Sequence, residues 1–159
     1  MTGHDINVIE RMVKEMGVKV ECVPTSRPNL MKDIQAGKFK LAVGGITRNV
    51  GRICYIETLP GYAPLGKAAL VRAAEKSKYM TLEDLNKSKV RGIKNLGETN
   101  EAFVLENLKA AQVSTDEKNV EIPGLISEDK GSVMITETCE ALHYSRPVRV
   151  CMPLTSMRL

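Results

Sequence analysis

Segments with the period of a helix and segments with the alternation of a strand follow one another along this chain. Apolar residues recur three and four positions apart before Gly17, and glycine suits the left-handed position that ends many helices. The next run, 18–23, places apolar side chains at alternate positions and stops at Pro24, as a strand does. Such alternation predicts an α/β protein with mainly parallel sheets.

A polar stretch at 73–79 separates two groups of these segments. The elements expected before it are a helix at 28–37 and strands at 18–23, 39–43 and 67–72. The elements expected after it are strands at 90–94, 113–115, 133–136 and 148–151, and helices at 99–110, 120–128 and 137–145. A short helix is expected to start at the capping box that opens with Thr81. We therefore expect two lobes, 1–75 and 76–152, followed by a tail, 153–159.

The composition is that of a globular chain, with 43% hydrophobic and 26% charged residues among 159. The net charge of +4 comes from lysines and arginines spread along the chain, which argues against a nucleic-acid-binding stripe. No apolar stretch approaches the roughly 18 residues of a membrane span. The first residues lack the charged start and apolar core of a signal peptide. The four cysteines show no metal-ligand spacing, so we expect no metal site.

A glycine-rich segment, 44–52, offers groups that can hold a carboxylate. Gly44 and Gly45 expose backbone N–H groups, Thr47 adds a hydroxyl, and Arg52 presents a planar guanidinium that matches two carboxylate oxygens. The alternative is an ordinary solvated arginine after a glycine loop.

The start of the helix expected at 99–110 is a second candidate anion site. Thr99 or Asn100 would occupy its N-cap, where free N–H groups and the helix dipole favour negative charge. A plain helix cap fits the same residues equally well. Glu101 in the first turn is assigned to stabilising the dipole rather than to catalysis.

Glu137 and Glu140 lie three residues apart, and we expect them to be neighbours on one helix face. Two close carboxylates tend to separate in pKa, which leaves one able to hold a proton near neutral pH. The alternative is the ordinary acidic start of a helix.

Four segments, in this order and spacing, resemble the cyclohexadienyl dehydratases and, more distantly, the amino-acid-binding receptors of ABC transporters. The similarity runs from about residue 5 to residue 151, and the segments are 23–31, 44–52, 97–103 and 135–141. The resemblance implies a periplasmic-binding-protein type II-like α/β fold of two lobes with a ligand cleft between them.

The resemblance also implies a carboxylate clamp in the first lobe. The resembling proteins grip a ligand carboxylate with an arginine at the Arg52 position. Thr47 supports that contact, and Gly44 and Gly45 are further substrate-binding candidates.

In the second lobe the resemblance implies ligand contacts and an acid. The stretch with Thr99 and Asn100 faces the cleft in the dehydratases. The Glu137 position is usually Asp, which receptors use against the ammonium group of the ligand. The Glu140 position is the proton donor of the dehydratases.

The implied activity is the acid-catalysed dehydration of prephenate or arogenate with loss of carbon dioxide, in phenylalanine biosynthesis. Aromatisation drives the reaction, so no cofactor and no metal are expected. Two alternatives stay open: an amino-acid-binding receptor of an ABC transporter, and a degenerate domain that acts as a structural or interaction subunit. The expected ligand is a small carboxylate or an amino acid.

The chain also departs from the family pattern. The opening strand of the first lobe is absent, and the segments that rebuild this lobe after Cys151 do not follow. Arg27 stands where an aromatic residue normally stacks on the ligand. We expect an incomplete first lobe that needs another chain or the missing segments. Members of this family are usually periplasmic, but no signal peptide is present here, so the sequence leaves the compartment open.

Overall fold

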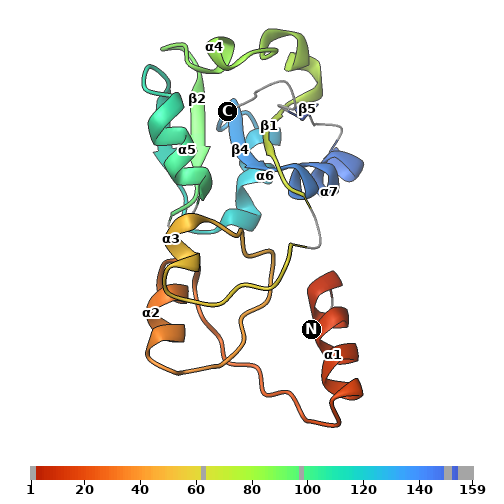
Figure 1. Cartoon of the computed structure of the whole chain (residues 1–159). Helices are drawn as coiled ribbons and strands as arrows, with labels where there is room; N and C mark the ends of the chain where they lie inside the picture. Colours follow the sequence, from red (N-terminus) through yellow and green to blue (C-terminus); the bar gives the residue numbers. More distant parts are fainter. Residues whose placement is uncertain (1–2, 62–63, 97–98, 149–151, 154–159) are drawn as a thin grey trace. The chain divides into compact units, whose positions relative to one another are not determined.

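The computed structural model describes residues 3–61, 64–96, 99–148 and 152–153. The chain divides into two compact units, Met1–Tyr62 and Ala63–Leu159. Figure 1 shows their elements, and each unit is described by itself.

The first unit contains short helices joined by chain without regular secondary structure. The elements are α1 (His4–Glu15), η1 (Arg27–Asn29), α2 (Leu30–Gln35) and α3 (Val50–Ile53). As predicted, α1 stops before Gly17, which has a φ of 67°. The N–H of Val18 then donates to the carbonyl of Val13 at 3.1 Å, which satisfies a carbonyl in the last turn.

The strands expected at 18–23 and 39–43 are not formed, and this prediction is wrong for residues 3–61. Neither segment is a strand in the structure, and no neighbouring strand within that range accepts or donates their backbone hydrogen bonds. Their apolar side chains are exposed, among them Val20 and Val43. Alternation gives the chain a strand-like surface, but a ladder also needs a partner strand.

The buried part of the first unit is small. Ile9 and Leu30 are its buried apolar residues within the described range. Asp33 is also buried, and its carboxylate accepts a hydrogen bond from the Thr25 hydroxyl at 2.7 Å and pairs with Lys38 at 2.7 Å. These contacts, chiefly the one with Lys38, lower the pKa of Asp33 below its ordinary value.

The second unit is built on a mixed sheet in the order β3-β2-β4-β1-β5. The strands are β1 (Lys67–Val71), β2 (Arg91–Lys94), β3 (Gln112–Thr115), β4 (Val133–Glu137) and β5 (Met152–Pro153). β2 runs parallel to β3 and β4, whereas β1 runs antiparallel to β4 and β5. The sheet is therefore mixed rather than mainly parallel. β1, expected as a strand that leaves the first lobe, pairs within this unit; the predicted lobe boundary at 75/76 stays a prediction.

The helices of this unit pack around β4 and the strands beside it. They are η2 (Ala73–Lys78), α4 (Leu82–Leu85), α5 (Thr99–Asn107), η3 (Asn119–Glu121), α6 (Ile122–Ser127) and α7 (Thr138–Val148). α5, α6 and α7 all contact β4. The capping box at Thr81 is confirmed: its hydroxyl accepts from the N–H of Asp84, and the Asp84 carboxylate accepts from the N–H of Thr81. The strand expected at 148–151 lies largely outside the described residues.

The core of the second unit lies on both sides of β1 and β4. β1 is buried from its second residue to its last, and β4 from its first residue to its fourth. The largest fully buried apolar side chains are Leu85, Ile122, Ile126, Met134 and Ile135. Because these come from strands and helices alike, the unit has a continuous apolar interior of the kind that stabilises a domain.

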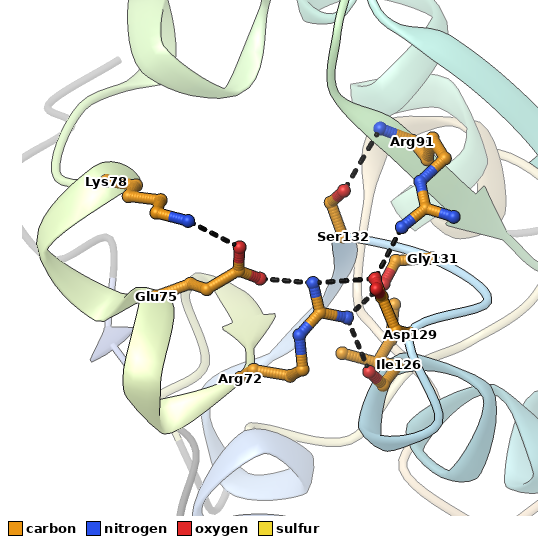
Figure 2. A network of polar contacts seen from close by, with 8 residues as sticks. All are labelled: Arg72, Glu75, Lys78, Arg91, Ile126, Asp129, Gly131 and Ser132. Carbon is orange, nitrogen blue, oxygen red and sulfur yellow. Dashed lines mark hydrogen bonds and ion pairs between the residues drawn. The ribbon is translucent and has the colours of Figure 1, made fainter.

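A polar network ties the end of β1 to the turn before β4 (Figure 2). The Arg72 guanidinium donates to the carbonyls of Ile126 and Gly131, both at 2.8 Å, and pairs with Glu75 and Asp129. A Cβ on Gly131 would lie 2.6 Å from Cδ1 of Ile93, so the turn packs too closely for a side chain here. The network fixes the end of the β1–β4 pair opposite to the polar cluster described next.

Candidate functional site

A lysine at the start of β1 is the centre of a polar cluster in the second unit. Lys67 and Glu137 are directly opposite each other in the antiparallel pairing of β1 and β4. Gly66 and Thr138 exchange two hydrogen bonds beside them, at 3.3 and 2.9 Å. Side chains that are opposite in such a pair lie on the same face of the sheet, so the register itself brings ammonium and carboxylate together.

Three side-chain oxygens surround the ammonium of Lys67. Nζ lies 2.6 Å from Oε1 of Glu137, 2.8 Å from Oγ1 of Thr99 and 2.5 Å from Oδ1 of Asn100. The Thr99 hydroxyl in turn donates to Oε1 of Glu137 at 3.2 Å. An ammonium has three N–H donors, so all three have an acceptor.

The Lys67 cluster, composed of Lys67, Thr99, Asn100 and Glu137, is largely shielded from solvent. The side chains of Lys67 and Glu137 are 21% and 15% exposed, and Asn100 is buried. An ion pair in such a position is less screened by water than one on the open surface.

The structure thus brings together the three second-lobe ligand candidates predicted from sequence, and it adds a residue that sequence reasoning missed. Thr99 and Asn100 lie in the first turn of α5, and Glu137 is the last residue of β4. Their side chains contact Lys67. The sequence feature that could have identified Lys67 is a lysine at the first position of an otherwise apolar strand, Lys67–Val71.

Glu140, in the first turn of α7, has a different environment from Glu137. Its carboxylate accepts hydrogen bonds from the Thr136 hydroxyl and from Nδ2 of Asn119, the latter at 2.9 Å. Within the described part of the chain it forms no ion pair. Oδ1 of Asn119 is buried and has no hydrogen-bond partner among these residues. Thr136 is fully buried and Glu140 half-buried, so the carboxyl group is partly enclosed by neutral donors.

The expectation that Glu137 and Glu140 share a helix face is wrong. Glu137 belongs to β4, and α7 begins one residue later. The two carboxylates have separate partners: Glu137 has the Lys67 ammonium and the Thr99 hydroxyl, and Glu140 has the Thr136 hydroxyl and the Asn119 amide. The physical reason is that β4 continues through Glu137 because this residue pairs with Lys67 in the strand register.

Tyr144 lies one helical turn beyond Glu140. Burial, and then the negative charge of Glu140, raise the pKa of the Tyr144 phenol above its ordinary value. The phenol therefore stays neutral to a higher pH than an exposed tyrosine does.

The predicted carboxylate clamp lies in the first unit. Gly44 and Gly45 have φ values of 125° and 65°, a conformation that favours glycine. Nη1 of Arg52 donates to the backbone carbonyl of Thr47 at 2.6 Å, and the backbone N–H of Arg52 donates to Oδ1 of Asn49 at 3.0 Å. No ion pair of Arg52 is found among the described residues. The guanidinium is therefore oriented by the loop while it lacks a carboxylate partner there.

The described residues hold no group of three or more His, Cys, Asp or Glu side chains that could bind a metal ion. Cys22, Cys54 and Cys139 are exposed free thiols, and Cys151 lies outside the described residues. No helix in the described ranges is long and apolar enough to cross a membrane.

Residues 1–143 match the family of bacterial extracellular solute-binding proteins, family 3. The chain belongs to this family. The α/β, periplasmic-binding-protein type II-like fold expected from the sequence is thereby confirmed, with the mixed sheet described above.

Among characterised relatives, the chain is 35% identical over 144 residues to cyclohexadienyl dehydratase of Pseudomonas aeruginosa. The alignment covers 91% of this chain and 54% of the relative, so the chain spans about half the length of that enzyme.

Solved structures similar to this chain include amino-acid-binding proteins and a cyclohexadienyl dehydratase. An ancestral amino acid-binding protein, described as a precursor of cyclohexadienyl dehydratase, superposes with a TM-score of 0.88 at 32% identity, over 94% of this chain and 65% of the other. An ancestral cyclohexadienyl dehydratase is 42% identical with a TM-score of 0.53, over 95% and 63% of the two chains. A binding component of an ABC transporter from Wolinella succinogenes, complexed with lysine, shares the fold at 22% identity and a TM-score of 0.85, over 99% and 69%.

For a member of the solute-binding family, the site residues predicted here fall into two groups. Gly44, Gly45, Thr47 and Arg52 form a loop and helix start in the first unit, whereas Thr99, Asn100, Glu137 and Glu140 lie at strand and helix ends of the second. Their roles toward a ligand are proposals, developed below.

Proposed function

We propose that this chain provides the site residues of a cyclohexadienyl dehydratase-like protein, which dehydrates and decarboxylates prephenate to phenylpyruvate. The similarity to cyclohexadienyl dehydratase of Pseudomonas aeruginosa supports this reaction class. The chain spans about half the length of that relative. The activity is therefore proposed for the complete protein that contains these residues.

The observation that carries the proposal is the environment of Glu140. A general acid must be stable both with its proton and without it, and it must not be locked in an ion pair. The Thr136 hydroxyl can donate to a carboxylate or accept from a carboxylic acid, and the Asn119 amide carries both a donor and an acceptor. These partners therefore suit both protonation states of Glu140.

The proposed reaction requires one proton, which Glu140 donates to the leaving hydroxyl. The bond between the ring carbon and the hydroxyl oxygen breaks, and the hydroxyl takes the proton of Glu140 and leaves as water. The bond between the ring and its carboxylate breaks at the same time, carbon dioxide leaves, and that electron pair completes the aromatic ring. Aromatisation drives the step, and positioning with a single proton transfer supplies the catalysis.

Arg52 is the proposed carboxylate anchor. Its guanidinium is oriented by the Thr47 carbonyl and has no carboxylate partner among the described residues. The donors of this planar fork that do not bind Thr47 can bind a carboxylate. The backbone of Gly44 and Gly45 is proposed to contribute further donors.

Within the second unit, the Lys67 cluster is a proposed ligand contact. Thr99, Asn100 and Glu137 hold the Lys67 ammonium in one position, so its positive charge is fixed before a ligand arrives. We assign these three residues to positioning Lys67, in addition to any direct contact they make with the ligand.

An amino-acid-binding receptor is the second candidate function. It is favoured by the likeness to the ancestral amino acid-binding protein at 32% identity. A receptor would bind its amino acid and release it unchanged, so turnover separates the two proposals.

The experiment uses the complete natural protein that contains this chain. It compares the wild type with the Glu140→Gln variant. Glutamine keeps the size and the hydrogen bonds but delivers no proton, so phenylpyruvate formation should fall about 10²–10⁴-fold. Binding of the substrate, measured by calorimetry, should change little. Glu128→Gln, which removes an exposed carboxylate paired with Lys130, is the control and should leave the rate unchanged.

An unchanged rate in Glu140→Gln would reject Glu140 as the acid. Binding of free amino acids without turnover of prephenate would instead support the receptor. If a complete, folded protein shows neither binding nor turnover, the result would favour a structural or interaction subunit.

A further inference from the structure

The two oxygens of the Glu140 carboxyl group have hydrogen-bond partners of different kinds. Oε1 accepts from Nδ2 of Asn119 at 2.9 Å, and Oε2 accepts from the hydroxyl of Thr136. An amide N–H can only donate, whereas a hydroxyl can donate to an oxygen or accept from it. A proton on Oε1 would therefore face the amide N–H, while a proton on Oε2 meets a group that can accept it.

The Asn119 amide also carries an acceptor, Oδ1, but its donating side is the one held against Glu140. A carboxylate oxygen requires a donor there, because the amide oxygen in the same place would bring two acceptors together. Oδ1 is buried and has no hydrogen-bond partner among the described residues. Turning the amide would carry two N–H groups into that shielded position, and a buried N–H without an acceptor is rarer in proteins than a buried oxygen with a free lone pair. The donating orientation is therefore favoured in both protonation states of Glu140.

We infer that Asn119 is a positioning residue that keeps Oε1 of Glu140 unprotonated and thereby makes Oε2 the oxygen that carries and donates the proton. The inference rests on the proposed function and deepens its acid step. When the Oε2–H bond breaks, the proton passes to the leaving hydroxyl and the electron pair stays on the carboxyl group. The negative charge spreads to Oε1, where the Asn119 N–H already donates, so this hydrogen bond strengthens as the charge develops.

The first test uses no substrate and therefore separates this inference from the proposed function. Neutron diffraction from deuterated crystals of the complete natural protein, soaked at successively lower pH until the Glu140 carboxyl group carries a deuterium, locates the deuterium atoms of both side chains. We expect that deuterium on Oε2, with a deuterium of Asn119 Nδ2 directed at Oε1. A deuterium on Oε1, or an amide with Oδ1 toward Glu140, would overturn the inference. If the expected positions are found but prephenate is not turned over, only the dehydratase proposal fails.

The second test replaces the donor and keeps a side chain of similar size. Asn119→Leu removes the N–H, and Asn119→Asp places an acceptor beside Oε1, which draws the Glu140 proton to that oxygen. Each variant should lower kcat for phenylpyruvate formation about 10–100-fold, as expected for the loss of one hydrogen bond to a charged group, with KM little changed. Asn119→Asp keeps the test available should Asn119→Leu fail to fold. An unchanged kcat in either folded variant would overturn the inference.

A double variant and a matched control separate positioning from a structural role. In the Glu140→Gln background, where no acid remains, Asn119→Leu should cause no further loss of rate, because Asn119 acts through Glu140. Asn107→Leu is the control: Asn107 is also half-buried, and its Nδ2 donates at 2.9 Å to the backbone carbonyl of Phe103 instead of to a carboxylate. It should leave kcat unchanged. An equal loss from Asn119→Leu with and without the acid, or an equal loss in Asn107→Leu, would show that a general disturbance of the fold lowers the rate and would overturn the inference.

Discussion

The two units use similar apolar sequences in different ways. In the second unit, β1 and β4 pair along their whole length, and their apolar side chains are buried from both sides by helices. In the first unit, segments 18–23 and 39–43 form no strand, and their side chains are mostly exposed. A segment with apolar, strand-like residues therefore forms a strand only where a partner strand is present.

The difference extends to the polar contacts. The second unit has its strand ends fixed by the Arg72 network on one side and by the Lys67 cluster on the other. In the first unit, the buried polar contact is that of Asp33 with Thr25 and Lys38. The second unit should therefore carry most of the free energy of unfolding, and the following predictions are arranged to challenge that view.

The largest effect is expected from a cavity in the second unit. Met134→Ala removes a fully buried side chain from the middle of β4 and should lower the free energy of unfolding by about 2–5 kcal/mol in denaturant titrations. Val20→Ala, in an exposed segment of the first unit, should change it by less than about 0.5 kcal/mol. Equal losses in the two variants would contradict the comparison.

A smaller effect is expected from adding one methyl group. The Cβ of Gly131→Ala would lie 2.6 and 2.7 Å from atoms of Ile93 and 2.9 Å from Cδ1 of Ile126, so it should destabilise the protein by about 1–3 kcal/mol. Gly51→Ala, in α3 of the first unit, meets its nearest atom at 3.6 Å and should be neutral or slightly stabilising. Thermal unfolding of both variants checks the pair, and a tolerated Gly131→Ala would mean that the turn before β4 is not closely packed in solution.

The smallest effect concerns acid stability. The hydrogen bond from Lys78, and the nearby charge of Arg72, hold the pKa of Glu75 below its ordinary value of 4.5 against the opposing effect of burial. A lowered pKa contributes stability above about pH 4.5, and this contribution is lost as the pH falls through the folded-state pKa. Glu75→Gln should therefore flatten the fall of the thermal midpoint below about pH 4.5.

The matched carboxylate in the first unit is Asp33, whose pKa is also lowered, chiefly by Lys38. Asp33→Asn should leave the acid limb of the main unfolding transition unchanged, because the first unit contributes little to that transition. A flattening by Asp33→Asn as large as that by Glu75→Gln would show that the two units unfold together.

Much of the second unit could be predicted from the sequence because its signals are local. The capping box at Thr81 and the apolar run at β4 identify elements whose partners are present. The same kind of signal misidentified 18–23 and 39–43, since nothing in an alternating segment tells whether a neighbouring strand exists. The end of β4 was missed by one residue for a related reason: Glu137 stays in the strand because Lys67, seventy residues away, pairs with it.

The candidate site was predictable in its residues but not in its contacts. Resemblance selected Thr99, Asn100 and Glu137, and the structure brings their side chains to one ammonium. Lys67 itself carries no local signature of function, since a lysine at the start of a strand is usually solvated. Asn119 was missed because it lies 21 residues before Glu140, and only the folded chain brings the two side chains together. The completion of the first lobe by another chain or further segments stays a prediction.

Amide hydrogen exchange tests the central comparison most directly. Amides in β1 and β4 should exchange only through global opening, because they are hydrogen-bonded in a buried sheet. Amides at 19–25 and 39–43 donate no backbone hydrogen bond among the described residues and should exchange at nearly the rate of an unfolded chain. Strong protection of these two segments, equal to that of β4, would mean that they form a paired sheet in solution and would contradict the account.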